Sequence, residues 1–213
     1  SDDKILMNAF LHGEDIHDVT AKELGVERFW GKTANFLLAF GGSEYRLAST
    51  LNIDTWKAKK FKEKYWKKFW GLELWIEDFL QKTRNNENIV ESILGRKMKI
   101  ENLSSQEWKV KQHAERQAIS CKIQGSAADI LKRATLDCYD NGYMPLLTVH
   151  DELVFSLDKD DEESYTCIKD IMENAISLKI PLTVEYGKGN NWKEAKENHK
   201  GEVKNVEYSH AVK

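Results

Sequence analysis

A short polar turn between two apolar segments carries two adjacent carboxylates, Asp151 and Glu152. The flanking segments, 146–149 and 152–155, are rich in Leu, Val and Phe, a composition typical of β-strands joined by a tight hairpin turn. Neither carboxylate can be buried without a partner, so both are expected at an exposed end of a sheet. Magnesium prefers oxygen ligands and often takes only one or two carboxylates. The pattern fits a metal site, and it also fits an ordinary polar turn, which Asp favours.

A second candidate site is a stripe of side chains that recur at a spacing of four residues, Arg28, Lys32, Phe36 and Phe40. On a helix each such step drifts by only ~40°, so the four side chains share one face. Two cations at the amino-terminal half could hold a triphosphate, while Phe36 packs on a sugar and base. A solvated pair of cations above two core phenylalanines explains the same spacing.

A third candidate combines Glu115-Arg116 with the small residues of segment 124–129, Gln-Gly-Ser-Ala-Ala-Asp. Small residues on a helix allow a ligand or another backbone to approach closely. Arg116 and Gln124 could reach a duplex minor groove, whose acceptors can be contacted without reading the sequence. Tight packing between helices is the alternative explanation.

The segment from Trp56 to Trp70 is basic and aromatic, with seven lysines and only one acidic residue, Glu63. An amphipathic helix with inward aromatics and solvated lysines accounts for this composition. The functional alternative places the lysines near nucleic-acid phosphates.

Several elements must position these residues. Helices are predicted over 3–11, 15–24, 27–40, 43–51 and 54–82, and glycines 13, 25, 41 and 42 mark helix ends. A small hairpin or loop is expected at 88–100. A long helix is expected to begin at Ser104 or Ser105 and to end near Asn141. After the apolar hairpin come a helix over 160–178 and a strand over 181–186. This order indicates an α+β fold, an antiparallel sheet with helices on one face.

Composition excludes several classes of protein. No apolar run approaches the ~20 residues that span a bilayer, and the amino terminus lacks the features of a secretory signal. Three cysteines without a CxxC pair indicate neither a disulfide framework nor a zinc site. A net charge of −3 argues against a uniformly basic nucleic-acid binder, so the placement of charge matters more. We expect a soluble protein of a reducing compartment.

Taken in order, five segments resemble the motif series of family A DNA polymerases, the bacterial polymerase I type. They are Asp15-Ile16-His17, then Arg28, Lys32, Phe36, Phe40 and Gly41 at their spacing, then Leu94-Gly95-Arg96, then Glu115-Arg116 with 124–129, then Val149-His150-Asp151-Glu152. The resemblance implies helical fingers over 1–103, part of an antiparallel-sheet palm with the catalytic hairpin over 104–198, and a polar tail over 199–213. It implies a cytoplasmic protein of a bacterium or a virus-infected cell.

The resemblance implies a role for each candidate. His17, Arg28 and Lys32 would contact the phosphates of the incoming dNTP, Phe36 its sugar and base, and Phe40 the templating base. Arg96, Arg116 and Gln124 would hold primer–template DNA, with His150 beside the primer terminus. Asp151 would be a ligand and catalytic residue for two Mg²⁺ ions, and Glu152 a supporting one. The family reaction is attack of the primer 3′ hydroxyl on the α-phosphate.

The sequence also departs from the family pattern. Phe40 stands where the family usually has Tyr, and Leu37 replaces the Gly that commonly follows the residue at position 36. Ser120 stands where Asn is usual, and Trp70 replaces a common Pro. The strand that carries the other catalytic aspartate does not occur in the 213 residues, nor does a thumb. The expectation is a split polymerase in which an upstream chain supplies both. The alternatives are a non-catalytic DNA-binding remnant and an enzyme with an unrelated metal site.

Overall fold

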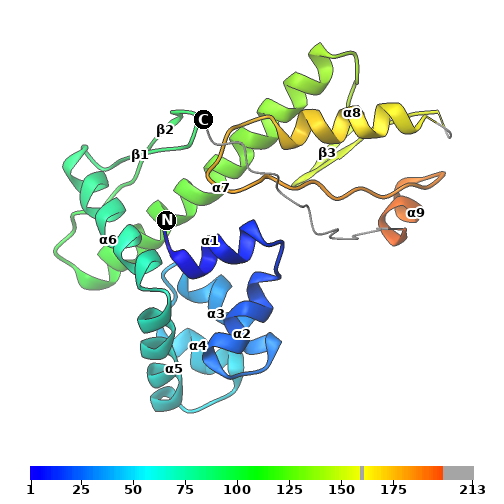
Figure 1. Cartoon of the computed structure of the whole chain (residues 1–213). Coiled ribbons are helices and arrows are strands. Elements are labelled where there is room, and N and C mark those ends of the chain that lie inside the picture. Colours follow the sequence, from blue (N-terminus) through cyan, green and yellow to red (C-terminus); the bar gives the residue numbers. More distant parts are fainter. Residues whose placement is uncertain (159–160, 199–213) are drawn as a thin grey trace, which may run out of the picture. The chain divides into compact units, whose positions relative to one another are not determined.

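The structure is a computed structural model of the chain, and it describes residues 1–158 and 161–198. Internal contacts divide the chain into two compact units (Figure 1). The first consists of residues 1–10 with 14–129, and the second of residues 11–13 with the chain from 130 onward. The long helix α7 (Trp108–Asp140) contributes residues to both units. The polar tail predicted at 199–213 lies outside the described residues.

Five helices open the chain: α1 (Lys4–Leu11), α2 (Ile16–Leu24), α3 (Arg28–Leu38), α4 (Glu44–Leu51) and α5 (Thr55–Lys68). The first four confirm the sequence prediction to within a few residues. Polar side chains begin two of them, since Asp15 caps α2 and Ser43 caps α4. Gly25 ends α2 in the left-handed conformation, with φ 67°, that glycine adopts without steric cost.

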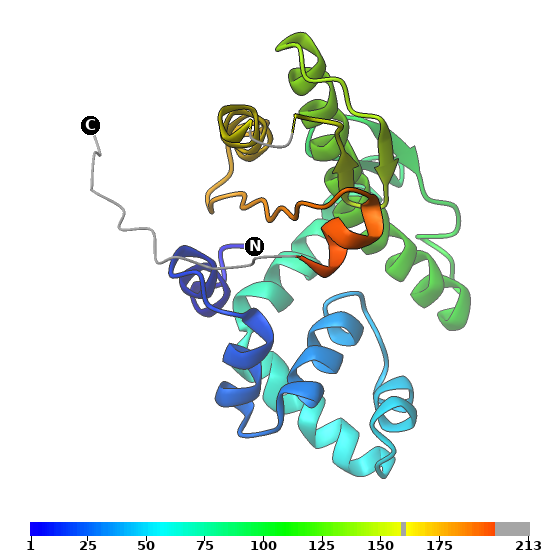
Figure 2. The same ribbon diagram turned by 90° about the vertical axis from the view of Figure 1, so that its right-hand side faces the viewer.

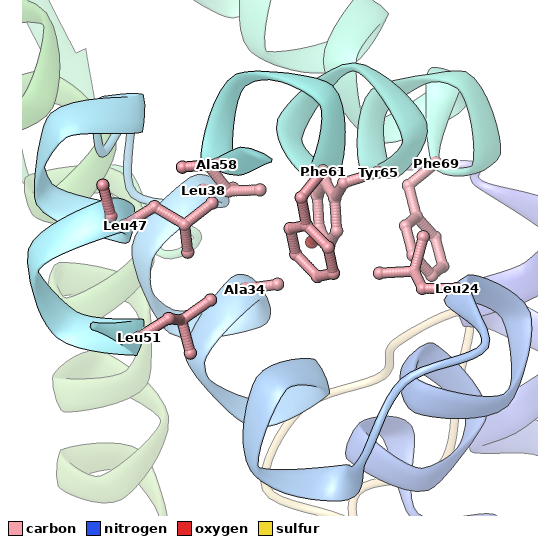
Figure 3. Close-up of a cluster of buried hydrophobic side chains, with 10 residues drawn as sticks. Leu24, Ala34, Leu38, Leu47, Leu51, Ala58, Phe61, Tyr65 and Phe69 are labelled. Carbon is pink, nitrogen blue, oxygen red and sulfur yellow. The ribbon is translucent and has the colours of Figure 1, made fainter. Parts of the chain in front are cut away.

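The main core of the first unit lies between α5 and helices α2, α3 and α4. Figure 3 shows Phe61, Tyr65 and Phe69 pointing from the α5 region into this cluster. Leu24 of α2 lies beside Phe69, and Leu38 of α3 lies beside Ala58. Tyr65 and Phe69 are almost completely buried. Burial of a large apolar side chain stabilises a fold by roughly 1.5–3 kcal/mol, so this cluster holds the helical bundle together.

The prediction of a single helix over 54–82 is wrong, because the helix is interrupted at Phe69. Helix α5 ends at Lys68, and α6 (Trp70–Asn85) begins after Phe69, whose ψ of 44° is not helical. Asp3 explains the break. Its buried carboxylate accepts hydrogen bonds from the backbone N–H of Ile5 and Leu6 and also from that of Gly71, at 3.1 Å. A Cβ on Gly71 would lie 2.9 Å from Asp3 Cα, so glycine permits this close approach.

A second core of the first unit surrounds a short hairpin. Strands β1 (Ile89–Glu91) and β2 (Lys97–Lys99) pair antiparallel with Val90 opposite Met98, which confirms a hairpin within 88–100. Val90 packs with Leu80, Ile100, Leu103, Ala114, Ala118 and Ile119. Helix α7 begins at Trp108 and not at the predicted Ser104 or Ser105, because turns occupy residues 101–104.

The second unit contains the predicted apolar hairpin. Strands β3 (Leu147–Val149) and β4 (Glu152–Val154) pair antiparallel, with Val149 opposite Glu152 across a two-residue turn. Helices α8 (Glu162–Glu173) and α9 (Trp192–Glu197) follow. Figure 2 shows α9 beside the hairpin. Helix α8 ends at Glu173, well short of the predicted residue 178.

The strand predicted over 181–186 is wrong. This segment is not a strand in the structure, and both sheets of the described residues have two strands. A strand needs a backbone partner, whereas Pro181 has no N–H and the Val184 N–H donates to a carboxylate oxygen of Glu173 at 2.8 Å. The α+β class is confirmed, with mainly helical structure and two small antiparallel hairpins. None of the helices in the described part of the chain is long and apolar enough to cross a membrane.

Candidate functional site

The first residue of the cationic stripe, Arg28, is held by two carboxylates. Its Nη2 lies 2.5 Å from Asp15 Oδ2, and its Nε lies 3.0 Å from Asp18 Oδ1. Asp15 also accepts hydrogen bonds from the backbone N–H of His17 and Asp18 as the cap of α2. The hydrogen bond from Arg28 lowers the pKa of Asp15, and Asp15 in turn raises the pKa of Arg28. The guanidinium is therefore positioned by α2, with about half of the side chain exposed.

His17 lies beside Phe36 of the same stripe. Their ring centroids are 5.5 Å apart, and Phe36 is 57% exposed. The Asn35 amide nitrogen, which can only donate, lies 3.1 Å from His17 Nδ1, so this nitrogen accepts and the ring proton is on Nε2. Asn35 Oδ1 accepts from Tyr65 Oη at 3.2 Å, which ties the amide to the core. These contacts hold the histidine ring in position and favour the tautomer with its proton on Nε2.

Helices α2 and α3 approach each other closely at this place. A Cβ on Gly31 would lie 2.6 Å from the backbone oxygen of His17 and 2.8 Å from the Ala21 nitrogen. Any side chain at position 31 would separate the two helices, and His17 would move away from Phe36. Glycine at this position is therefore part of what assembles the cationic and aromatic surface.

The four residues of the predicted stripe differ in their exposure to solvent. Arg28, Lys32 and Phe36 have exposed side chains, whereas Phe40 is half-buried against the second core of the first unit. Within residues 1–158 and 161–198, Lys32 has no ion-pair partner. The structure therefore leaves one free cation and one exposed ring beside the fixed Arg28 and His17.

Arg96 is fastened to α7. Its Nε lies 3.0 Å from Asp129 Oδ1, and its Nη2 donates to the Gly125 carbonyl at 2.8 Å. Asp129 is buried, and its Oδ2 has no hydrogen-bond partner among the described residues. The side chain of Arg96 is nevertheless 43% exposed. Arg96 thus anchors the β1–β2 hairpin and still presents cationic surface.

The other predicted grip residues lie on the same helix. Gln124 is exposed, and Arg116 is half-buried. The Arg116 Cγ would lie 3.1 Å from a Cβ on Gly41, whose φ of 78° also favours glycine. Glu115 forms an ion pair with Arg84 of α6 and is thereby held within the fold.

The basic helix α5 is explained largely by packing. Its aromatic residues Phe61 and Tyr65 are buried, and several of its lysines are paired within the protein. Lys62 pairs with Glu44 at 3.0 Å, Lys68 pairs with Glu23 at 2.7 Å, and Lys64 donates to the Leu24 carbonyl. These contacts account for the aromatics and for much of the positive charge without a nucleic acid.

In the second unit, the turn of the β3–β4 hairpin presents its two carboxylates differently. His150 has a φ of 54°, which a two-residue turn requires at its first position. Asp151 is exposed, and no hydrogen-bond or ion-pair partner occurs for it in the described part of the chain. Glu152 pairs through Oε1 with Lys196 Nζ at 3.2 Å, while its Oε2 is buried without a partner among those residues.

Both carboxylates line a cavity of about 1000 Å³. Its walls come from β4, α8, the extended segment 183–191 and α9. No group of three or more His, Cys, Asp or Glu side chains in residues 1–158 and 161–198 is arranged to hold a metal ion. Two adjacent carboxylates, one of them unpaired, nevertheless supply the hard oxygen donors that a magnesium ion takes from a protein when water and phosphate complete its shell.

Sequence reasoning gave no role to Asn35, Asp129 or Lys196, although Asp129 lies in the candidate segment 124–129. Asn35 and Asp129 each stand on the buried side of a helix, and a polar residue at an otherwise apolar helical position was a usable signal. Lys196 lies in a short polar helix, and its partner Glu152 is far away in the sequence, so no local pattern indicated it.

Comparison with known proteins gives a consistent result. The model of DNA polymerase family A matches residues 1–194. Relatives include the thermostable DNA polymerase I of Thermus filiformis, 37% identical over 92% of this chain, and DNA polymerase I of Bacillus caldotenax, 34% identical over 92%. Those matches cover 25% and 24% of the relatives, so the chain spans about a quarter of their length.

A solved structure matches as well. The POL domain of Pol1 from M. smegmatis, in complex with DNA primer–template and dNTP, is 34% identical and has a TM-score of 0.84. The match covers 92% of this chain and 37% of that one. The family match over most of its length shows that this chain belongs to DNA polymerase family A.

Proposed function

We propose that this chain forms the nucleotide-binding fingers and part of the palm of a DNA-directed DNA polymerase. The carrying observation is the unpaired, exposed carboxylate of Asp151 at the tip of a two-residue hairpin. An exposed carboxylate that has no cation partner among the described residues is available to a divalent metal ion. The division into fingers over 1–103 and palm over 104–198 belongs to this proposal.

In the fingers, His17, Arg28 and Lys32 are the groups that would receive the triphosphate. Asn35 holds His17 with its ring proton on Nε2, where it can be donated to a phosphate oxygen. Arg28 offers a planar donor group that suits phosphate, and Lys32 adds an unpaired charge. Phe36 has the exposed face needed to pack on the sugar and base. Phe40, half-buried, is proposed to lie beside the templating base.

In the DNA-binding part, Arg96, Arg116 and Gln124 are proposed to hold the primer and template. Arg96 keeps exposed surface while Asp129 fixes its guanidinium, so it offers a positioned cation. Gln124 is exposed on the same helix. His150, exposed in the hairpin turn, is proposed to lie at the primer terminus.

Asp151 is the residue that would hold Mg²⁺, with Glu152 in a supporting role. Divalent ions supply stabilisation of the attacking and leaving oxygens when they are bound. Both of these carboxylates line the same cavity. The split-polymerase hypothesis assigns a further aspartate, together with the thumb, to an upstream chain.

The test is primer extension with the purified chain, with and without the upstream polypeptide. Extension by the mixture alone, abolished by Asp151→Ala, is the expected result. Extension by the isolated chain would overturn the split-polymerase hypothesis. If the mixture binds primer–template but never extends it, the chain is a non-catalytic DNA-binding remnant. If Asp151→Ala extends primers as well as the unsubstituted chain does, the metal-ligand assignment is wrong.

A further inference from the structure

Helix α9 carries a cation to the candidate metal turn. Lys196 Nζ lies 3.2 Å from Glu152 Oε1, and its side chain lines the same cavity as Asp151 and Glu152. Within the described residues this is the only cation paired with either carboxylate. The ammonium therefore balances one of the two negative charges of the turn.

The position of Lys196 is fixed by its own helix. Its Nζ lies over the Trp192 ring, 4.9 Å from the centroid. Asn191 caps α9 by accepting from the Glu194 N–H at 3.0 Å, and the Asn190 N–H donates to Glu194 at 2.9 Å. A long lysine side chain loses much rotamer freedom when it is ordered, so these contacts make the pair with Glu152 less costly to form.

The two carboxylates of the turn consequently differ. Oε1 of Glu152 is engaged by Lys196, and its Oε2 is buried without a hydrogen bond within the described part of the chain. Asp151, one residue earlier, is exposed and unpaired within that part. If Lys196 were removed, the Glu152 carboxylate would lose its ammonium partner and would be free to compete for the same cation.

We propose that Lys196 is a positioning residue for the metal-binding turn. The ion pair with Lys196 keeps the Glu152 carboxylate from binding a metal ion. Asp151 is then the only free carboxylate of the turn, so a metal ion binds through Asp151 alone. This inference rests on the proposed function, because it takes the turn to be a metal site. It adds α9 to the structure of that site.

The probe is Mn²⁺, followed by electron paramagnetic resonance in titrations of the full-length chain. Lys196→Met removes a positive charge beside the carboxylates and frees Glu152, so Mn²⁺ is expected to bind about 3- to 10-fold more tightly at low salt. Lys196→Arg keeps the charge and should bind as the unsubstituted chain does. The double variant Lys196→Met/Glu152→Gln should also return to that affinity.

Lys193→Met is the matched control. It removes the same charge from the same helix. The Lys193 side chain is 84% exposed, and its Nζ lies 3.8 Å from Oε1 of Glu197. If Lys193→Met tightens Mn²⁺ binding as much as Lys196→Met does, the effect is one of general charge and the proposal is overturned. It is also overturned if Glu152→Gln does not cancel the effect of Lys196→Met.

The same variants are compared in primer extension by the assembled polymerase. Lys196→Met is expected to lower kcat several-fold and to shift the Mn²⁺ concentration at half-maximal rate downward, and Lys196→Arg should restore both. Asp151→Asn separates the two hypotheses. If it alters neither Mn²⁺ binding nor extension, the proposed function fails. If it abolishes extension while Lys196→Met behaves like Lys193→Met, only the role of Lys196 fails.

Discussion

The Nε of Arg96 lies 3.0 Å from Oδ1 of Asp129, and this ion pair joins the β1–β2 hairpin to α7. Asp129 is 6% exposed, and within the described residues Arg96 is its only paired cation. A buried carboxylate that loses its cation retains the full cost of desolvation. The pair is therefore more important to the fold than a surface ion pair with the same geometry.

Arg96→Ala is expected to lower the free energy of unfolding by about 2 kcal/mol, since it leaves the buried Asp129 carboxylate without a cation and removes the hydrogen bond to the Gly125 carbonyl. Urea unfolding followed by circular dichroism measures the change. Arg133→Ala is the control, because Arg133 pairs with Asp137 on the same helix at 2.9 Å but is 57% exposed. It should cost less than about 0.5 kcal/mol. Equal losses in the two variants would show that burial of Asp129 is not important.

The helices were predictable because their signals are local. Gly25 ends α2, Ser43 caps α4, and the two apolar segments on either side of the polar turn identified the second hairpin. The break between α5 and α6 was not predictable. It depends on Asp3 bonding to Gly71, 68 residues away, and no periodicity within 54–82 contains that information.

The sequence indicated which helix or turn carries each candidate residue, but it did not indicate the partners of those residues. The spacing of four placed Lys32 and Phe36 on one face of a helix, while it could not show that Asp15 and Asp18 hold Arg28. It also could not show that Phe40 turns into the core. Partners that come from another helix follow from tertiary packing, which a single-helix pattern does not encode.

Asp15→Asn is expected to strengthen triphosphate binding by about 3- to 10-fold. The substitution removes a carboxylate that competes with phosphate for Arg28, while the Asn oxygen can still cap α2. The measurement is a dATP titration by isothermal calorimetry. Asp78→Asn removes the same charge from an exposed pair with Lys82 and should leave the affinity unchanged. Weaker binding in Asp15→Asn would show that the pair orients Arg28 for phosphate and does not block it.

The same carboxylate predicts a pH dependence of stability. The hydrogen bond from Arg28 lowers the pKa of Asp15 in the folded state below its unfolded value of about 4. Its stabilising effect is therefore fully present above pH ~4 and is lost as the pH falls through the folded pKa. Urea unfolding between pH 6 and pH 3 should give a shallower loss of stability in Asp15→Asn than in the unsubstituted chain. Parallel curves would contradict the assignment.

Gly31→Ala is expected to destabilise the protein by about 2–3 kcal/mol, although alanine ordinarily stabilises a helix by roughly 1 kcal/mol relative to glycine. The added Cβ would lie 2.6 Å from the His17 carbonyl oxygen, a backbone atom that can move only if α2 and α3 separate. Thermal unfolding measures the loss, and a weaker dATP affinity should accompany it because His17 shifts from Phe36.

Gly125→Ala is the matched control for this last substitution. Position 125 also lies within a helix, but its added Cβ would meet the end of a flexible side chain, Met98 Cε, at 3.0 Å. That methyl group can rotate away, so the ordinary helical preference for alanine should prevail and the cost should stay near zero or become a small gain. If both variants lose similar amounts of stability, the backbone contact between α2 and α3 must adjust to an added Cβ as easily as a flexible side chain does.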